Sequence, residues 1–599
     1  MSGLAAEGEQ SSAGALTVSR SLSGRRWVWR AGADRVGLGI AQRFGLPELV
    51  GRLLAARGVE AEAVGDFLDP TLRALLPDPS GLIDMDRVAG RLADAIRRGE
   101  TVGVFGDYDV DGACSGALMA SFLRQFGCRV IPYVPDRLSE GYGPNLSALN
   151  RLVDGGATLI LCVDCGTAAG DILRAVSPTA DILVVDHHQN AGPPPPILAT
   201  VNPNRLDCRS GLGHLCATAI AFLTLVATVR ELRRRGHFAD SAAPDLLGLL
   251  DLVALATVCD VMPLTGLNRA LVAQGLKVMA RRARPGIAAL LDVAGVRAQP
   301  SAATLGFALG PRINAAGRIS ECDLGLRLLL TDDPIEARGL ASRLDAVNRQ
   351  RQQVEQAMLE EAMAAAELQA ARGCAVLLVA GKDWHPGVVG IVAGRIKERF
   401  NRPACVAALG EATAKGSGRS VPGLDLGAAV IAARQAGILQ TGGGHAMAAG
   451  FALAADRLDD FHGFMNDRLA AAAALPSVAD LVVEGTVAVA GCTIALAAQI
   501  GRLAPFGPGN EEPTLILPRA KVVRADRVGS DNNSIRAFVE GEQGGGRLKA
   551  MLFRAKDGPL ADALLGPRNI PLHLAGHLRL EDWNGTTTAG FVLADAAVV

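Results

Sequence analysis

The chain has 599 residues, more than one hydrophobic core usually organises, which predicts about three or four domains. Its 49% hydrophobic content and 20% charged content favour a globular α/β protein and exclude a disordered or fibrous chain. The formal net charge of -1 gives no basic excess, so any binding of nucleic acid requires a locally positive groove.

Cysteine usage and hydropathy predict a cytoplasmic protein that does not enter a membrane. Among 11 cysteines there is one Cys-x-x-Cys motif, Cys162 with Cys165, and no second pair with which it could hold zinc. We therefore expect reduced, packed thiols. The longest uncharged stretch, SGLGHLCATAIAFLTLVATV, has an apolar part too short to cross a bilayer and is predicted to be a buried helix. The first residues, MSGLAAEGEQSSAGA, lack the pattern of a signal peptide.

In chain order, the sequence first predicts an arm, an α/β domain and a long helix. Residues 1–40 are rich in Ser, Gly and Ala without clear periodicity, which is typical of a mobile N-terminal arm. Within 41–331, the apolar runs TVGVFG, CRVIPYVP, ATLILCV and DILVVD alternate with helical stretches, which indicates a doubly wound parallel sheet. From about Leu340 to Ala371 there is no Pro or Gly, so 332–371 is predicted to form one long connecting helix.

Two further domains are predicted in the second half. Residues 372–475 contain the apolar runs CAVLLVAG and PACVAALG around a helix, which predicts a smaller α/β domain carrying the glycine-rich loop TGGGHAMAAGF. In 476–599 short strand-like runs predominate, which favours an OB-like β-barrel that binds single strands. Phe538, Phe553 and Trp583 are candidates for base stacking there, and a purely structural barrel is the alternative.

Four apolar runs of the first α/β domain each end in acidic residues. TVGVFG leads into Asp107, Asp109 and Asp111, LILCV into Asp164, ILVV into Asp186, His187 and His188, and LVALATVC into Asp260. Because the carboxyl ends of neighbouring parallel strands meet at one crevice, we expect these side chains to converge. Their mutual repulsion and desolvation would cost several kcal/mol without cations. Carboxylates with one or two imidazoles suit Mn²⁺ or Mg²⁺.

Each of these motifs also has a simpler interpretation. The Asp107–Asp111 stretch fits an exposed turn that caps the next helix. The pair His187 and His188 fits a strand-end turn with side chains on opposite faces, and Asp260 alone would indicate nothing. The coincidence of ligand-type residues after all four runs favours the metal site over these alternatives.

The motifs together resemble the DHH phosphoesterases, a family named for the triad that stands here as Asp186, His187 and His188. GDYDVDG at 106–112, VDCGT at 163–167, VVDHH at 184–188 and ATVCDVMPL at 256–264 are similar to its signature motifs. The RecJ nucleases match most closely, through VPDRLSEGYG, LGPRINAAGR, GSGRS, GGGHAMAAG and PFGPGNEEP. The resemblance covers the chain from about Leu38, and HLCATAIAF at 214–222 matches only approximately. We expect no counterpart of the further C-terminal domain that some relatives have.

The resemblance implies a two-metal site and assigns its residues. It makes Asp107, Asp109, Asp111, Asp164, His187 and Asp260 the ligands of two Mn²⁺ or Mg²⁺ ions, with Asp164 as the bridge. His188 would face the substrate phosphate, and Asp186 would orient a histidine. For substrate binding it implies Arg137, Arg312, Arg318, Ser417, Arg419 and His445, although surface or interdomain salt bridges are the alternative for the arginines.

The expected function is that of a single-stranded-DNA-specific 5′-to-3′ exonuclease that releases 5′-mononucleotides in DNA repair and recombination. We expect a monomer that works with a helicase and a single-strand binding protein. Two alternatives are a DHH phosphodiesterase of cyclic dinucleotides or short RNA, which needs no barrel, and an inactive replication scaffold, which needs no acidic cluster.

Overall fold

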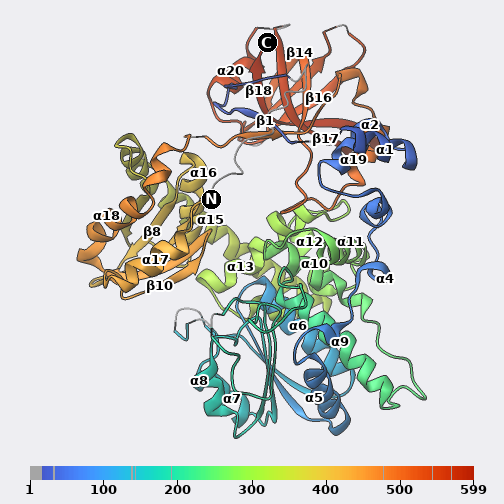
Figure 1. Cartoon of the computed structure of the whole chain (residues 1–599), viewed down its shortest axis with the longest axis vertical. Helices are drawn as coiled ribbons and strands as arrows, with labels where there is room; N and C mark the ends of the chain where they lie inside the picture. Colours follow the sequence, from blue (N-terminus) through green and yellow to red (C-terminus); the bar gives the residue numbers. More distant parts are fainter. Residues whose placement is uncertain are drawn as a thin grey trace, which may run out of the picture. The chain divides into compact units, whose positions relative to one another are not determined.

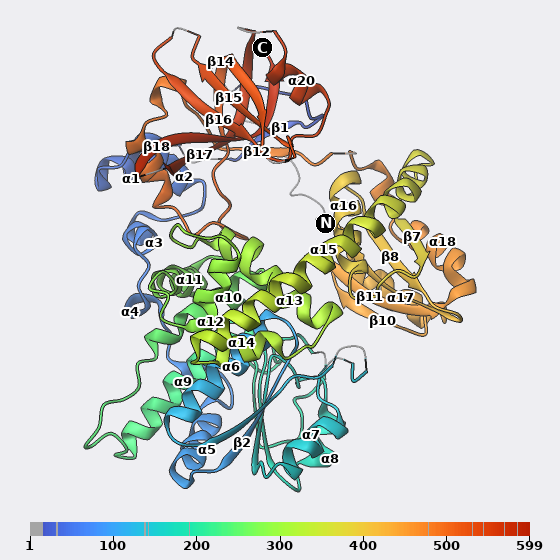
Figure 2. The same cartoon turned by 180° about the vertical axis from the view of Figure 1, so that it is seen from behind.

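The computed structural model describes residues 16–31, 34–136, 139–141, 143–190, 192–476, 478–529, 531–542, 544–567, 570–583 and 585–599 (Figures 1 and 2). The chain forms two compact units. One consists of Asp69–Leu475 together with Pro505–Glu511, and the other consists of the chain up to Leu68 together with Pro476–Ala504 and Glu512–Val599. In the described part of the chain, no helix has both the length and the apolar character needed to cross a membrane.

A parallel five-stranded sheet with helices on both faces organises the first half of the chain. Its strand order is β3-β2-β4-β5-β6, and its strands are β2 (Thr101–Gly106), β3 (Arg129–Tyr133), β4 (Leu159–Val163), β5 (Asp181–Val185) and β6 (Ala199–Val201). Side chains alternate between the faces, so Val102 and Leu161 join one core while Phe105 and Ile160 join the other. The first core also contains helices α5 (Met85–Arg98), α6 (Val110–Gln125) and α9 (Ala217–Arg234), and the second contains α7 (Leu146–Asp154) and α8 (Gly170–Val176). The expected doubly wound sheet is confirmed.

Helices complete this domain and lead out of it. They are α10 (Leu250–Cys259), α11 (Gly266–Met279), α12 (Pro285–Val293), α13 (Gly310–Ile319), α14 (Leu324–Leu330) and the predicted long helix α15 (Pro334–Ala371). The apolar run before Asp260, which we grouped with strands, is helix α10. A run this apolar has no periodicity that distinguishes a buried strand from a buried helix. The stretch expected to be a buried helix is largely α9, whose residues are mostly buried.

The smaller α/β domain has a mixed sheet of order β10-β11-β9-β8-β7, in which only β7 and β8 are parallel. Its elements are β7 (Leu377–Lys382), α16 (Val389–Phe400), β8 (Ala404–Leu409), β9 (Thr413–Arg419), α17 (Leu426–Gln435), β10 (Thr441–His445), β11 (Ala448–Ala454) and α18 (Leu458–Arg468). The glycine-rich segment forms the hairpin β10–β11, not the expected loop. Its glycines allow close packing, since a Cβ on Gly442 would lie 2.9 Å from Val430.

The C-terminal strands form a closed barrel of the OB type. They are β13 (Gly485–Thr486), β14 (Leu515–Val528), β15 (Ser534–Glu540), β16 (Arg547–Leu552), β17 (Pro571–Trp583) and β18 (Thr586–Val598), with α19 (Ile494–Gly501) and α20 (Pro559–Leu565). The sheet order is β13-β14-β15-β16-β18-β17, and pairing of β14 with β17 closes it. This confirms the predicted barrel.

The N-terminal segment differs from the expected mobile arm. Residues 1–15 lie outside the described residues, but β1 (Trp27–Trp29) pairs in parallel with β12 (Leu481–Val483). Trp27 is buried and its Nε1 donates a hydrogen bond to Asp595 Oδ2 at 3.0 Å. These long-range contacts cannot be inferred from a segment otherwise rich in Ser and Gly. The helices that follow, α1 (Asp34–Phe44), α2 (Glu48–Ala55) and α3 (Val64–Leu68), belong to the barrel unit, and α4 (Leu72–Leu75) to the other.

Candidate metal centre

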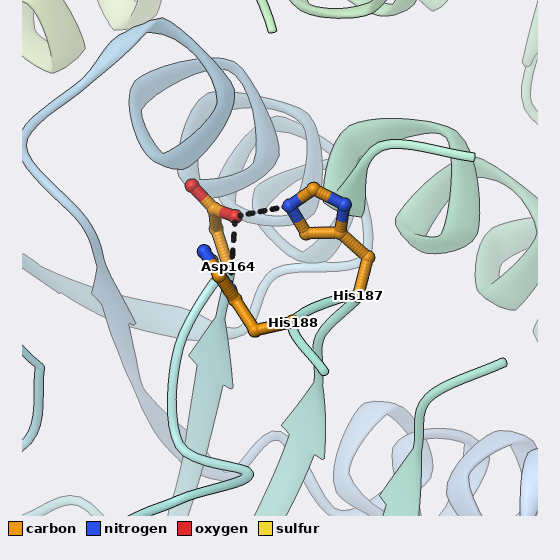
Figure 3. Close-up of side chains that lie close together, drawn as sticks. All are labelled: Asp164, His187 and His188. Atoms are coloured by element: carbon orange, nitrogen blue, oxygen red, sulfur yellow. Dashed lines mark ion pairs between the residues drawn. The ribbon is translucent and has the colours of Figure 1, made fainter. Parts of the chain in front are cut away.

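Three aspartates lie directly after three adjacent strands of the parallel sheet. Asp107 follows β2, Asp164 follows β4 and Asp186 follows β5, and these strands are neighbours in the order β2-β4-β5. All three side chains are nearly fully buried, at 3%, 1% and 1% exposure. His187 and His188 continue from Asp186, and Figure 3 shows both imidazoles directed toward the Asp164 carboxylate. The strand ends therefore meet as the sequence predicted.

Asp109 and Asp111 take part in helix capping as well as in this cluster. Asp109 Oδ1 accepts a hydrogen bond from the backbone N–H of Gly112 at the start of α6. Asp111 accepts three hydrogen bonds at the start of α9, from the N–H of Ala217 at 2.6 Å, the N–H of Thr218 at 2.8 Å and the hydroxyl of Thr218 at 2.6 Å. Asp109 thus caps the next helix, as the simpler interpretation expected. Asp111 does not fit that interpretation, because it is buried and binds the start of the distant helix α9 instead.

The imidazole of His187 stands at the middle of the carboxylates. Its Nε2 lies 3.3 Å from Asp164 Oδ1, 3.6 Å from Asp260 Oδ2 and 3.8 Å from Asp111 Oδ2. Three sets of side chains bring ligand atoms within 4.8 Å of one another. They are Asp107 with Asp109 and Asp164, Asp164 with His187 and His188, and Asp111 with His187 and Asp260. Asp164 belongs to two of these sets, and so does His187.

Burial and mutual repulsion raise the pKa values of the carboxyl groups. Desolvation, followed by the charges of Asp111 and other aspartates, raises the pKa of Asp164 well above its ordinary value. The same causes raise the pKa of Asp260 to about 9 and also raise the pKa of Asp109. The cluster is thus poorly stable as a set of anions without added positive charge.

A divalent cation fits the donors that are present. Among the described residues, Asp164 Oδ1 and Asp260 Oδ2 are buried and accept no hydrogen bond. Asp164 also has a backbone φ of 60°, a left-handed conformation that is uncommon outside glycine and that often accompanies function. Hard carboxylate oxygens with an imidazole nitrogen are ligands suited to Mn²⁺ or Mg²⁺.

Asp186 binds its neighbours instead of pointing its charge at the cluster. Its Oδ1 lies 2.7 Å from His188 Nδ1 and accepts the N–H of His187, and its Oδ2 accepts the N–H of Thr167. Desolvation tends to raise the pKa of Asp186, but the hydrogen bond from His188 outweighs it and lowers that pKa to about 2. Desolvation tends to lower the pKa of His188, but the hydrogen bond to Asp186 outweighs it and raises that pKa to about 9. Asp186 therefore favours the protonated form of His188.

Sequence reasoning missed two asparagines and a threonine that fix the histidine backbone. Asn202 Nδ2 donates to the carbonyl of His188 and to the hydroxyl of Thr167, both at 2.9 Å. Asn204 Nδ2 donates to the carbonyl of His187 at 2.6 Å. Asn202 directly follows β6, so the rule that found the aspartates at strand ends would have found it too.

The residues expected to bind substrate separate into distinct environments. Ser417 and Arg419 lie on β9, where Arg419 donates to the Ser417 hydroxyl at 2.9 Å, and a Cβ on Gly390 of α16 would lie 3.0 Å from Arg419 and 3.1 Å from Ser417. Arg318 donates to the carbonyl of Gly387 at 2.9 Å. Arg312 instead donates to Asp345 and to the carbonyl of Ala308, which matches the salt-bridge alternative.

The remaining two residues expected to bind substrate are His445 and Arg137. His445 is exposed at the end of β10. Arg137 lies outside the described residues, as does the side chain of Trp583.

Comparison with known proteins identifies the family. Three family models match the chain, namely "DHH family, N-terminal domain" over residues 101–257, "DHHA1 domain" over 372–471 and "RecJ OB domain" over 483–595. The single-stranded-DNA-specific exonuclease RecJ of Escherichia coli (strain K12) is 37% identical over 564 residues, which cover 92% of this chain and 95% of that protein. The RecJ of Bacillus subtilis (strain 168) is 32% identical, over 96% of this chain and 71% of its own length.

Solved structures agree with the sequence comparison. The crystal structure of RecJ in complex with Mn²⁺ from Thermus thermophilus matches with a TM-score of 0.76 and 29% identity, over 95% of this chain and 79% of that one. The Mg²⁺ complex from the same organism matches with a TM-score of 0.71 and 28% identity, over 96% and 78%. Since both the whole chain and its three domains match, this protein belongs to the RecJ family of single-stranded-DNA-specific exonucleases.

Proposed function

We propose that this protein is a metal-dependent exonuclease that degrades single-stranded DNA from its 5′ end and releases 5′-mononucleotides. The observation that carries the proposal is the buried acidic cluster at three adjacent strand ends, in which two carboxylate oxygens accept no hydrogen bond from the described residues. The metal complexes of the Thermus relatives and the name of the curated relatives support it.

We assign the cluster to two divalent cations, Mn²⁺ or Mg²⁺. Asp107, Asp109 and Asp164 would hold one ion. His187, with the carboxylates of Asp164 and Asp260 at 3.3 Å and 3.6 Å from its Nε2, would hold the other, so that Asp164 would serve both ions. When bound, the ions would supply the Lewis acidity needed to activate water and to stabilise charge on the attacking and leaving oxygens. Asp111 completes the expected ligand set, but its three hydrogen bonds to α9 favour a mainly structural role.

The chain's own residues position and neutralise the substrate phosphate. His188, kept protonated by Asp186, would donate a hydrogen bond from a ring N–H to a phosphate oxygen and offset the charge that develops there. Thr167, Asn202 and Asn204 fix the backbone that carries both histidines, so the imidazoles need little reorganisation during reaction.

A chain of contacts supports recognition of the 5′ phosphate by Arg419, Ser417 and Arg318. A Cβ on Gly317 of α13 would lie 2.8 Å from the carbonyl of Tyr108, beside the first aspartates. The next residue, Arg318, contacts Gly387, and Gly390 in turn packs against Arg419 and Ser417. Thus one continuous series of packed residues links the two α/β domains.

Arg419 has the properties of an anion-binding residue. Burial lowers its pKa, and within the described residues no carboxylate forms an ion pair with it. A half-buried guanidinium without an acidic partner is costly unless an anion binds. Arg137 of the family motif is the expected further contact.

The barrel is proposed to bind the strand beyond the cleavage site. On its outer face Phe538 of β15 stands opposite Lys549 of β16, and Phe553 follows β16 with 56% of its surface exposed. An aromatic side chain beside basic ones suits sequence-independent stacking of bases.

We further propose a cytoplasmic monomer that acts in repair and recombination with a helicase and a single-strand binding protein. The 11 cysteines are all free, as expected in a reducing compartment. For the domains, we propose the boundaries expected from the sequence, except that the segment up to Leu68 joins the barrel unit.

One assay tests the proposed activity. Purified protein would be given 5′-labelled single-stranded DNA, duplex DNA and a cyclic dinucleotide, each with and without Mn²⁺. We expect mononucleotides from the single strand alone, and only with Mn²⁺. Preferential hydrolysis of the cyclic dinucleotide would favour the small-molecule phosphodiesterase, and inactivity on all three would favour the scaffold.

A further inference from the structure

We propose that the segment Pro505–Glu511, here called the clamp, is a positioning element that fixes Asp260 in the metal centre. The inference rests on the proposed function of Asp260 as a ligand. The clamp belongs to the motif PFGPGNEEP, which lies in the sequence of the barrel region but packs in the unit of the metal centre.

The backbone just after Asp260 adopts a conformation that its sequence disfavours. Helix α10 ends at Cys259, and the N–H of Met262 returns to the carbonyl of Thr257 at 3.1 Å. Val261, which stands between Asp260 and Met262, has a φ of 60° and is 66% exposed. This left-handed position at a helix end is usually glycine, and it is a clear outlier for a β-branched residue. Such a conformation persists only where the surroundings impose it.

The clamp contacts the residues that follow this turn. The N–H of Leu264 donates to the carbonyl of Pro508 at 2.7 Å. A Cβ on Gly507 would lie 2.7 Å from Leu264, and a Cβ on Gly509 would lie 3.3 Å from both Pro263 and Thr265. No side chain larger than hydrogen fits at Gly507 without moving Leu264, so the two segments are in close contact.

The clamp is itself rigid, and a second anchor holds the turn from its other side. Gly507 and Asn510 exchange backbone hydrogen bonds of 3.0 Å, and Asn510, only 1% exposed, donates from Nδ2 to the carbonyl of Pro505 at 2.8 Å. Arg269, 2% exposed, contacts the same carbonyl. Asn268 donates to the carbonyl of Pro263 at 3.1 Å.

Asp260 depends on its backbone for position. Its Oδ2 is buried and accepts no hydrogen bond from the described residues, while it lies 3.6 Å from His187 Nε2. Because no hydrogen bond from the described residues orients that oxygen, its place depends on the position of the Asp260 backbone and on the packing around the side chain. The clamp fixes the turn, and the turn fixes Asp260.

Loosening the clamp should weaken one of the two metal sites. The test measures Mn²⁺ binding to the whole protein by electron paramagnetic resonance, without substrate, for wild type, Asp260→Ala and Asn510→Ala. We expect two bound ions in wild type, and in Asn510→Ala a loss of affinity of about 10- to 100-fold for one ion only, the range for groups that orient a ligand. The ion assigned to Asp107, Asp109 and Asp164 should bind unchanged.

The matched control is Asn466→Ala in α18. Like Asn510, Asn466 donates from Nδ2 to a nearby backbone carbonyl, that of His462, and its Oδ1 accepts from the N–H of Val376, but it lies within the smaller α/β domain. It should leave both affinities unchanged even if it lowers the melting temperature equally. If Asn510→Ala does not fold, Gly509→Ala replaces it, since it strains a φ of 73° and presses on Pro263.

A rescue experiment separates positioning from general stability. Val261→Gly adopts the left-handed turn without strain, so the clamp is less needed, and Asn510→Ala should cost less than about threefold in affinity in that background. Two outcomes would overturn the proposed role of the clamp but not that of Asp260. One is an equal loss of affinity with and without Val261→Gly, and the other is unchanged binding in Asn510→Ala while Asp260→Ala loses an ion. Two ions still bound by Asp260→Ala would overturn the proposed ligand, and the clamp with it.

Discussion

The metal centre and the barrel carry their charges in opposite ways. In the centre, carboxyl groups are buried together, and the basic side chains that the described residues place among them are the imidazoles of His187 and His188. On the barrel, basic side chains are paired with acids. The pairs are Arg519 with Glu542, Arg524 and Arg536 with Asp526, Arg527 with Asp557, Arg547 with Glu540, Lys549 with Glu581, and Arg579 with Glu512.

With the proposed ligands, this difference predicts how each region would bind. A buried like-charged cluster is unstable alone and gains stability from each cation that it binds. An exposed ion pair contributes only about 0 to 1 kcal/mol, so a DNA phosphate can replace the acidic partner at little cost. We therefore expect strong, specific metal binding in the centre and weak, salt-dependent DNA binding on the barrel.

Asp164→Asn tests the centre and should have the largest effect. Asn keeps the shape and tolerates the left-handed φ of 60°, but it removes the shared charge. Hydrolysis should fall at least about a thousandfold, on the order of 4 kcal/mol of barrier. The metal-free protein should become more stable, because one repulsive charge is gone. Initial rates and denaturant unfolding in a chelator measure both effects, and activity within about tenfold of wild type would exclude Asp164 as the shared ligand.

Asp111→Asn is the same substitution in the same cluster, with the opposite expected effect on stability. Its carboxylate accepts three hydrogen bonds at the start of α9, and the amide group of Asn would oppose some of these donors. The free energy of unfolding of the metal-free protein should fall by about 2 to 4 kcal/mol. A rise in stability equal to that of Asp164→Asn would show that Asp111 is a repulsive ligand and not a cap.

Arg419→Ala tests the half-buried cation that has no acidic partner among the described residues. Loss of one charge-assisted fork should cost about 1.5 to 3 kcal/mol, seen as reduced preference for a 5′-phosphate over a 5′-hydroxyl end. Arg312→Ala is the control, since Arg312 already pairs with Asp345. The measurement compares initial rates on both ends and on 3′-blocked DNA. Degradation that a 3′ block stops would contradict the proposed polarity.

Phe538→Ala combined with Phe553→Ala should have the smallest effect. We expect affinity for long single strands to fall by about 1 kcal/mol, or about fivefold, the low end for loss of a stacked base, and dinucleotide hydrolysis to stay unchanged. Removing everything after residue 475 would be a poorer test, because β1 would lose its partner β12. Equal loss on long and short substrates would show that the barrel face does not hold DNA.

The sequence predicted the part of the site that depends on strand ends. Asp107, Asp164 and Asp186 were found because a parallel sheet brings carboxyl ends together whatever surrounds them. The helix before Asp260 was not predicted from the sequence, since an uninterrupted apolar run fits either a strand or a helix. Nor does spacing reveal that Asp111 caps α9, whose first residues are 106 positions away.

The packing of the clamp was the feature that the sequence predicted least. Its motif stood out in the sequence, but Arg269 and Pro505 are 236 positions apart and no local pattern connects them. Long-range pairings of this kind depend on which surfaces fit each other, and periodicity carries no information about that fit. Similarly, Arg312 and Arg419 occur in comparable motifs, and the ion pair of Arg312 with Asp345 shows that their surroundings differ.

The pairing of β1 with β12 has a consequence for the order of events during synthesis. Trp27 pairs with Leu481, so the ribosome must add more than 400 residues before the N-terminal strand meets its partner. At about 5 to 20 residues per second, this takes roughly 20 to 90 s. For that time Trp27 and Trp29 remain without the strand that covers them, and the segment is open to chaperones and proteases. The nascent chain can fold its parallel sheet early, but the barrel unit closes last.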